Sequence, residues 1–189
     1  MLPVRAVSIT ALQLQSNGVW KARPGCRVLI IDGGALRFDY PQDWILHAGA
    51  DSVCLVAPDL PERPTVLAAS VKRISMPASM IPLELYMREI AEFDPRVLAD
   101  VGGDFVRVRR PPLEAGWVES HLTDPRDGRE ISKRICFARA GCTRALIAFQ
   151  SWLEDRARMD AVWETVLDTL AVGDYLEDIA TGRRREKRG

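Results

Sequence analysis

The sequence predicts an α+β protein in which a central antiparallel sheet carries helices on both faces, an α/β/α sandwich. Two observations predict this fold class. Short apolar stretches with strand-like alternation follow one another along the chain and are separated by turn residues, which is typical of antiparallel sheets. Residues 145–152 are apolar on both alternating faces, and helical periodicity occurs twice elsewhere, so we expect one helix to cover each face of the sheet.

The first elements are expected to form a hairpin. Residues 27–31 and 35–40 are apolar stretches on either side of the Asp-Gly-Gly at 32–34, which is a turn signal. Pro41 has no N–H to donate to a sheet, so it predicts a corner after the second strand. Residues 4–15, ahead of the hairpin, fit either a strand or an arm.

The middle of the chain predicts strands interrupted by one helix. Residues 52–57 form a short apolar stretch and residues 65–74 are rich in β-branched side chains, so each predicts a strand. Apolar residues at helical spacing over 83–93 predict a helix. Residues 105–108 and 117–123 then predict two more strands, because prolines separate them and a turn-forming stretch follows.

The last third predicts a hairpin followed by a long helix. Apolar side chains share one parity over 131–137 and again over 145–149, and an Ala-Gly pair at 140–141 supplies the turn. Residues 174–179, after a glycine suited to end a helix, predict a short helical extension. The long helix itself carries one apolar stripe, made of Met159, Val162, Trp163, Val166, Leu167 and Leu170.

The 189 residues are expected to form one domain. Residues 25–173 hold the predicted elements, and a second core would leave each half only marginally stable. Residues 1–24 are expected to form an N-terminal arm or strand. Residues 174–189 are expected to form a C-terminal extension, whose basic end at 183–188 is predicted to be a disordered tail.

Composition and charge narrow the functional class. Apolar residues make up 47% of the chain and charged residues 28%, which is ordinary for a soluble globular protein. The chain has 26 basic and 26 acidic residues, so no net charge draws it to nucleic acid, and no such partner is expected. Residues 1–19 hold no apolar run long enough for a secretory signal or a membrane span, which predicts a cytoplasmic protein with reduced cysteines.

Two short motifs resemble a known family. Residues 38–44 read Phe-Asp-Tyr-Pro-Gln-Asp-Trp, similar to the Phe-x-Tyr-Pro-x-x-Trp opening of PsbP-like domains, and residues 163–170 resemble their closing helix. The family includes the extrinsic subunit of the photosystem II oxygen-evolving complex, and a Ran-binding nuclear import factor shares its fold. The resemblance, over roughly 27–172, implies an antiparallel sheet with helices on both sides and a role in protein binding rather than catalysis. No metal-binding or Ran-binding residue of the family matches a position of this chain.

No motif of the chain indicates catalysis or metal binding. The common nucleotide-binding, zinc-protease and serine-hydrolase signatures are absent. Ser120 and His121 are neighbours in a predicted strand and so point to opposite faces, which argues against a nucleophile and base pair. Cys136 and Cys142 lack zinc-ligand spacing, and Cys54 between two apolar residues is typical of a buried thiol. No cofactor and no metal are therefore expected.

Basic residues and one tryptophan are the candidates for binding a partner. Arg107, Arg109 and Arg110 lie close together and form a candidate anion-binding surface. An ordinary solvated strand face is the alternative, which the interspersed acidic residues favour. Trp20 lies in a breaker-rich segment ahead of the core and is a candidate exposed anchor. Four further basic residues of the predicted hairpin would extend the same surface: Lys133, Arg134, Arg139 and Arg144.

Three functions remain open from the sequence. The first is a non-catalytic protein-binding or adaptor module, which the missing catalytic motifs and the PsbP-like resemblance favour. The second is a chaperone or assembly factor for a secreted or membrane protein. The third is a small enzyme of an unfamiliar type that uses Cys54 or His121. A protein partner is expected, and the sequence does not set the oligomeric state.

Overall fold

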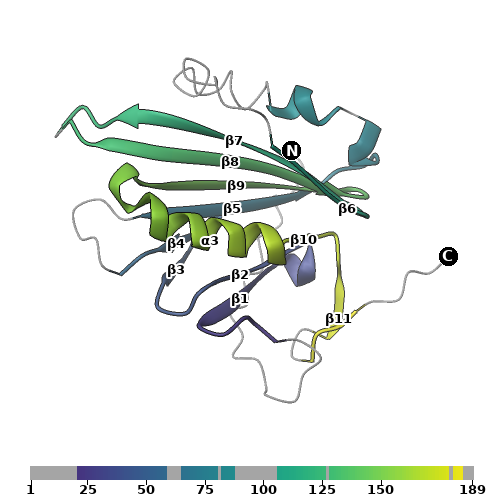
Figure 1. Ribbon diagram of the computed structural model, residues 1–189. Helices are drawn as coiled ribbons and strands as arrows, with labels where there is room; N and C mark the ends of the chain where they lie inside the picture. Colours follow the sequence, from purple (N-terminus) through teal and green to yellow (C-terminus); the bar gives the residue numbers. More distant parts are fainter. Residues whose placement is uncertain are drawn as a thin grey trace.

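A seven-stranded antiparallel sheet dominates the molecule (Figure 1). The computed structural model describes residues 21–58, 65–80, 82–87, 106–126, 128–178 and 181–184. Neighbouring strands of this sheet are all antiparallel. From one edge to the other, the strands are β3 (Ile45–Ala48), β4 (Val53–Val56), β5 (Val66–Arg73), β9 (Thr143–Trp152), β8 (Glu130–Ala140), β7 (Leu113–Thr123) and β6 (Val106–Arg110).

The centre of the sheet is the β8–β9 hairpin that the sequence predicts. Its turn follows Ala140, and Ala140 pairs with Thr143 across it. Successive side chains of β8 point to opposite faces, and both sets are buried: Cys136 belongs to one apolar cluster, whereas Phe137 belongs to another. The prediction that both faces of the central strands are covered is therefore confirmed for these strands.

A separate three-stranded sheet holds the predicted first hairpin. It contains β1 (Cys26–Ile31), β2 (Leu36–Pro41) and the short β10 (Ala171–Val172). The hairpin is confirmed, with the 3-10 turn η1 (Asp32–Gly34) between its strands. Gly34 has a φ of +98°, and a Cβ there would lie 2.5 Å from the carbonyl oxygen of Asp174, so only glycine fits this turn.

The helix α3 (Arg156–Thr169) lies between the two sheets (Figure 1). The predicted stripe is confirmed: Met159, Trp163 and Val166 are buried. The Trp163 ring stacks on Phe149 of β9 with centroids 5.8 Å apart and meets Trp117 of β7 edge-on at 5.7 Å. Aromatic pairs in these geometries add to the burial energy of the core, so they hold α3 against one face of the large sheet. We call this face the α3 face.

The opposite face is covered in part by residues 83–87, which are helical. Leu83, Tyr86 and Met87 pack on the large sheet, and the Tyr86 ring stacks on Phe137 at 4.4 Å. The remainder of the predicted helix lies outside the described residues. The antiparallel sheet with one long helix is thus established, whereas a sandwich with full helices on both faces is not confirmed.

Several local features differ from the predictions: β7 begins at Leu113 rather than at residue 117, and β10 was not predicted. The strand β3 was not predicted, because its side chains are mostly exposed and show no burial pattern. The helical extension at 174–179 is wrong, since β11 (Leu176–Asp178) is a strand that pairs with β12 (Arg183–Arg184). Leu176 is buried against Val28 and Ile30 of β1, so tertiary packing overrides the local pattern.

The ends of the chain are described only in part. The first two residues of the predicted disordered tail lie in β12, and residues 185–189 lie outside the described residues. Residues 1–20 also lie outside them, so the N-terminal arm and the domain boundaries stay predictions. No helix in the described part of the chain combines the length and apolar character needed to cross a membrane.

Candidate protein-binding surface

The three arginines of β6 divide between the two faces of the sheet. Side chains alternate along a strand, so Arg107 and Arg109 share the face opposite α3 and Arg110 lies on the α3 face. The Arg110 guanidinium donates hydrogen bonds to the backbone carbonyls of Leu167 and Asp168 in the last turn of α3. A cation at this end of a helix is favourable because the helix dipole is negative there. Arg110 therefore supports the fold rather than the candidate site.

Arg109 belongs to a row of charged side chains that crosses five strands. Cross-strand partners lie on the same face of a sheet with Cβ atoms about 4.5–5.5 Å apart. The strand register pairs Arg109 with Glu114, Glu114 with Arg139, Arg139 with Arg144, and Arg144 with Lys72. We call the four cations of this line, Arg109, Arg139, Arg144 and Lys72, the basic row.

A small cavity of about 110 Å³ opens beside the basic row. Its volume is enough for a carboxylate group or a few water molecules, since a water occupies about 30 Å³ in the liquid. Strands β6, β7 and β8 and the start of the helical segment supply its walls. The lining residues are Pro82, Leu83, Glu84, Arg107, Arg109, Glu114, Ala115 and Arg139.

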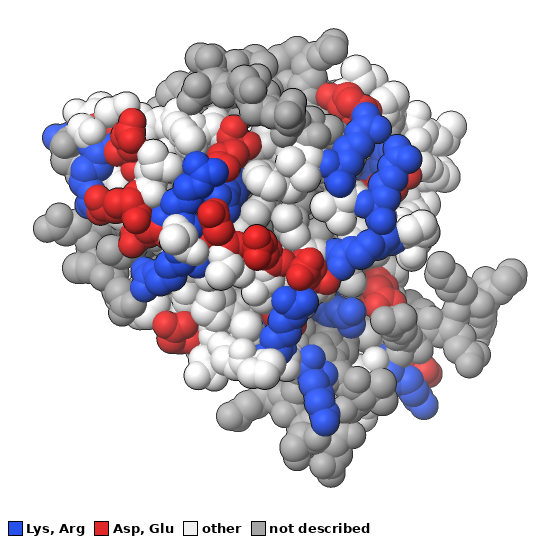
Figure 2. All heavy atoms as spheres, in the orientation of Figure 1, with Lys and Arg blue, Asp and Glu red and all other residues white. Residues whose placement is uncertain are grey.

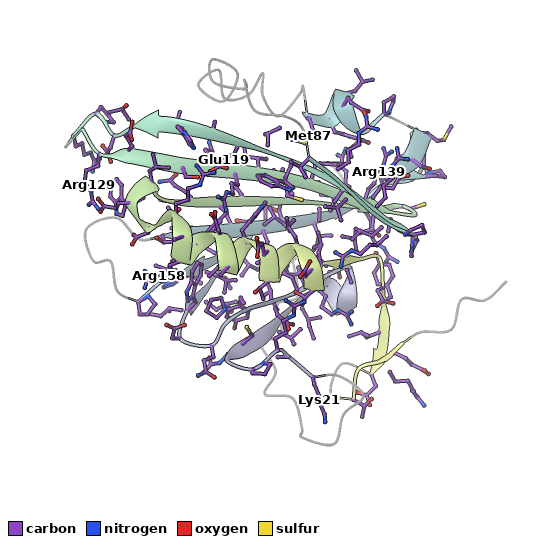
Figure 3. All side chains as sticks on the ribbon, viewed as in Figure 1. Lys21, Met87, Glu119, Arg129, Arg139 and Arg158 are labelled. Carbon is purple, nitrogen blue, oxygen red and sulfur yellow. The ribbon has the colours of Figure 1, made fainter. Side chains whose placement is uncertain are left out.

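Arg139 is the fixed centre of this site. Its Nε and Nη2 donate to the Oε2 atom of Glu114 at 2.9 and 2.7 Å, and its Nη1 donates to the carbonyl oxygen of Ala78 at 2.8 Å. The guanidinium is buried, which suits a charge only because it is paired and hydrogen-bonded. Figure 3 shows Arg139 near the β6 end of the sheet, beneath the segment that carries Ala78.

The other cations of the site are more accessible. Arg107 forms an ion pair with Glu84, and both side chains are nearly half exposed. Arg109 is exposed, and within the described residues no carboxylate lies within ion-pair distance of it. Arg144 lies over the Tyr86 ring with its Cζ 5.4 Å from the centroid, a cation–π contact. Among the residues that the structure describes, five cations thus meet two carboxylates here, a local formal charge of +3 on a chain whose net charge is zero.

Acidic and basic side chains are arranged differently on the α3 face than on the face of the basic row. Figure 2 shows a band of acidic side chains across this face, with basic side chains on both sides of it. Along α3 itself, three accessible carboxylates follow one another at four-residue intervals: Asp160, Glu164 and Asp168. The two faces of the large sheet therefore differ in charge, acidic along α3 and basic along the row.

A buried ion-pair network ties α3 to β7 and β8. The Arg134 side chain is only 5% exposed, and it donates to Glu119 at 3.2 Å and to Asp160 of α3. Burial raises the pKa of Glu119, but a hydrogen bond from Ser132 at 2.7 Å and the charges of Arg134 and Arg156 outweigh it, so the pKa lies below its ordinary value. Glu119 lies beside the first half of α3, well away from Arg139 (Figure 3).

The residues considered for catalysis do not form a site. His121 is exposed with its Nε2 3.5 Å from Glu119, whereas the neighbouring Ser120 is buried and bonds the Lys133 carbonyl, so the prediction that they face apart is confirmed. Cys54 is half buried on β4 with the exposed His47 as its cross-strand neighbour, at the opposite edge of the sheet from the cavity.

The remaining candidates are Cys136 and Trp20. Burial raises the pKa of Cys136 to about 12, so its thiol stays protonated. Trp20 lies outside the described residues. Among the residues that the structure describes, no three His, Cys, Asp or Glu side chains gather in a way that would hold a metal ion.

The sequence identified part of this surface and missed part of it. Arg139 and Arg144 were expected near the β6 arginines, and they lie in line with Arg109, whereas Arg134 belongs to the other face. Glu84, Glu114 and Lys72 were not singled out. The signal that would have found them is the register of the strands, which depends on hairpin geometry more than on residue type.

The arrangement of a large antiparallel sheet, a small second sheet and a helix between them defines a PsbP-like α+β protein. The structure is similar to that of cyanobacterial PsbP (CyanoP) from Synechocystis sp. PCC 6803, with a TM-score of 0.55 and 12% identity over 85% of this chain and 98% of that one. The resemblance to PsbP-like domains is thereby confirmed at the level of the fold. The chain belongs to the Alr1449 family, whose model matches residues 27–176.

Three further proteins are similar to this chain. The chain is 28% identical over 173 residues to the uncharacterized protein alr1449 of Nostoc sp. (strain PCC 7120), covering 90% of each protein. A crystal structure from Bacteroides thetaiotaomicron VPI-5482 aligns with a TM-score of 0.54 and 15% identity. The alignment covers 77% of this chain but only 47% of that chain. The Ran-binding protein Mog1p of Saccharomyces cerevisiae aligns with a TM-score of 0.48 and 10% identity over 78% of this chain and 95% of that one.

Proposed function

We propose that the protein is a non-catalytic protein-binding module that holds an acidic segment of a partner protein against the basic row. The observation that carries the proposal is the concentration of Arg109, Arg139, Arg144 and Lys72 in one line of a sheet face, on a chain without net charge. A general excess of basic residues does not explain such a line. Complementary charge patches of this kind steer association and select partners.

The chemistry of the row suits carboxylates. Arginine binds a carboxylate through two parallel hydrogen bonds, and a charged donor makes them stronger than neutral ones. Arg139 is buried and already bound to Glu114 and Ala78, so it adds a fixed positive charge to the row, and the more exposed Arg109 beside it is the guanidinium that would contact a ligand carboxylate.

A nucleic acid suits the row less well. Sequence-tolerant binding of single strands relies on exposed aromatic rings on which bases stack. Among the described residues, the aromatic side chain beside the row is Tyr86, which is buried, with one ring face against Phe137 and with Arg144 over the ring. The described part of the surface therefore offers charge and carboxylate geometry but no exposed ring on which a base would stack.

A chaperone or assembly factor is the second candidate function, and one observation favours it. Three large apolar side chains are exposed on the two segments that contribute Ala78 and Glu84 to this site: Met76 (48%), Met80 (69%) and Leu85 (44%). Exposed methionines adapt their shape to different apolar clients. A client with apolar and acidic residues close together would contact both surfaces.

A site-specific photo-crosslinker tests the proposal. A photoreactive residue replaces Leu85 in the full chain, and adducts formed in cells are identified by mass spectrometry. We expect one main adduct whose cross-linked peptide is acidic, and at least a fivefold loss of that adduct when R109E is added. The matched control is R158E, the same charge reversal on the exposed side of α3. Equal adduct yield in the R109E and R158E proteins would overturn the proposal, and a pattern of many unrelated apolar clients would support the chaperone instead.

A further inference from the structure

Strand β6 is an edge of the large sheet. In the described part of the chain β7 is its only strand neighbour, and the order of strands ends there. In an antiparallel pair, backbone groups alternate between pointing at the partner strand and pointing away from it. Every second residue of β6 therefore directs its N–H and C=O groups toward the outer edge, which no described strand covers and which we call the open edge; an added strand would bind these groups.

The side chains of β6 alternate in character as well as in direction. Arg107 and Arg109 lie on the face of the basic row, and Val106 and Val108 lie on the α3 face. Val106 is 41% exposed, whereas Val108 packs against the main core. A strand laid beside β6 would meet Arg107 and Arg109 on one of its faces and Val106 and Val108 on the other, where the Arg110 guanidinium is bound to the end of α3.

Charge complementarity decides which strand fits this edge. A neighbouring strand places its side chains about 4.5–5.5 Å from those of β6, so acidic residues at every second position would face Arg107 and Arg109. The intervening positions would face Val106 and Val108 and are best apolar. Like charges directly opposite are destabilising, so a second copy of the basic β6 strand is disfavoured as the occupant.

We propose that the partner binds by adding a strand to β6, and that the added segment has acidic and apolar residues in alternation. This inference rests on the proposed function, because it assumes that the basic row binds a protein. It adds the mode of binding: backbone hydrogen bonds along the open edge of β6 supply affinity, and Arg107 and Arg109 read the acidic positions. The other edge strand, β3, has no arginine or lysine and exposes Ile45 instead, so it does not select the same segment.

A set of synthetic peptides tests the mode of binding. The parent probe is a fluorescent nine-residue peptide with glutamate at alternate positions and valine between them, and binding to the full chain is measured by fluorescence anisotropy. A control peptide has the same composition with the glutamates in one block. One variant is N-methylated at the glutamates and another at the valines, so that each blocks the hydrogen bonds of one edge of the peptide.

The expected result is an asymmetry between the two N-methylated peptides. We expect one of them to bind at least tenfold more weakly than the parent and the other to bind like the parent, because β6 pairs with one edge of the added strand. The block peptide is expected to bind at least fivefold more weakly. Equal binding of both N-methylated peptides, or equal loss in both, would overturn strand addition.

The same experiment separates the two proposals. If the parent peptide fails to bind, or binds R109E as tightly as the wild type, then the proposed function itself fails. If the parent binds, loses at least tenfold with R109E and not with R158E, and yet shows no edge asymmetry, then the protein binds acidic segments by side chains alone and only strand addition fails.

Discussion

Removal of Arg134 tests whether the buried ion pairs hold α3 on the sheet. The Arg134 side chain is 5% exposed and joins Glu119 of β7 to Asp160 of α3. The substitution Arg134→Ala would leave Glu119, which is 16% exposed, with its hydrogen bond from Ser132 and with Arg156, whose side chain is 47% exposed. The cost is therefore that of a largely buried carboxylate deprived of its main cation.

The magnitude follows from the burial of the two carboxylates. Breaking a buried ion pair by removing one partner costs about 3–5 kcal/mol. Asp160 is 42% exposed, so water compensates part of its loss, and we expect Arg134→Ala to lower the free energy of unfolding by about 2–4 kcal/mol. For a chain of this length each kcal/mol shifts Tm by about 2–4 °C, so Tm should fall by roughly 10 °C.

The matched control is Arg156→Ala. Arg156 also contacts Glu119, with Nη2 3.3 Å from Oε2, but its side chain is 47% exposed, so the expected cost is about 0.2–1 kcal/mol. Urea unfolding followed by tryptophan fluorescence, with circular dichroism as a second probe, measures both variants. Equal costs for the two substitutions would refute the argument that burial decides the strength of this network.

The pH dependence gives a second readout of the same network. The pKa of folded Glu119 lies below its ordinary value, so its contribution to stability is present above the unfolded pKa and is lost as pH falls through the folded pKa. In Arg134→Ala the main opposing cation is gone and burial raises the pKa of Glu119. The stability difference between wild type and variant should therefore shrink as the medium becomes acidic, and a difference that grows in acid would contradict the sign.

Two further predictions concern a turn and a thiol. Gly34→Ala should cost at least about 2 kcal/mol in urea unfolding, because the residue has a φ of +98° and its new Cβ would lie 2.5 Å from a backbone oxygen, whereas Gly33→Ala, at +63° with open space around it, should cost about 1 kcal/mol. Thiol labelling at pH 8 with peptide mapping should modify the exposed Cys142 quickly and Cys136 only after unfolding, because burial raises the pKa of Cys136 to about 12; similar rates at both would contradict its burial.

Local pattern was enough to predict most of the strands and the long helix. In the β8–β9 hairpin, apolar side chains recur at every second position of the sequence. In α3, the helical spacing places Met159, Trp163 and Val166 on one side of the helix. These features repeat with the period of the element that carries them, so a single chain reveals them. The Asp-Gly-Gly turn at 32–34 is equally local, since the backbone conformation it needs is rare for other residues.

Features set by distant contacts were not predictable. The first hairpin was expected to contribute to one central sheet, yet β2 pairs with β10, which depends on where α3 ends. The strand β11 owes its conformation to the burial of Leu176 against the first hairpin, a contact between opposite ends of the domain. In both cases the deciding partner is remote in sequence, and local propensity is weaker than such packing.

The candidate surface was half predictable for the same reason. The arginines of β6 are adjacent in sequence and were recognised as a group, but strand alternation sends Arg110 to α3 and the other two to the opposite face. The pairing of Arg139 with Glu114 crosses from β8 to β7 and follows from the register alone. Charge counting finds the residues, whereas register decides which of them act together.

The way the strands are joined has a consequence for how the chain folds. Strand β5 pairs with β9, and Arg37 of β2 pairs with Ala171 of β10, so each sheet is completed by residues from the last third of the chain. Pairings this far apart in sequence must overcome a large loop-closure entropy, and proteins dominated by them fold slowly. During synthesis, β2 and β5 therefore leave the ribosome before the strands that pair with them, β10 and β9, have been made. We expect folding to be largely post-translational, with the nascent chain dependent on cellular chaperones until α3 and β10 have left the ribosome.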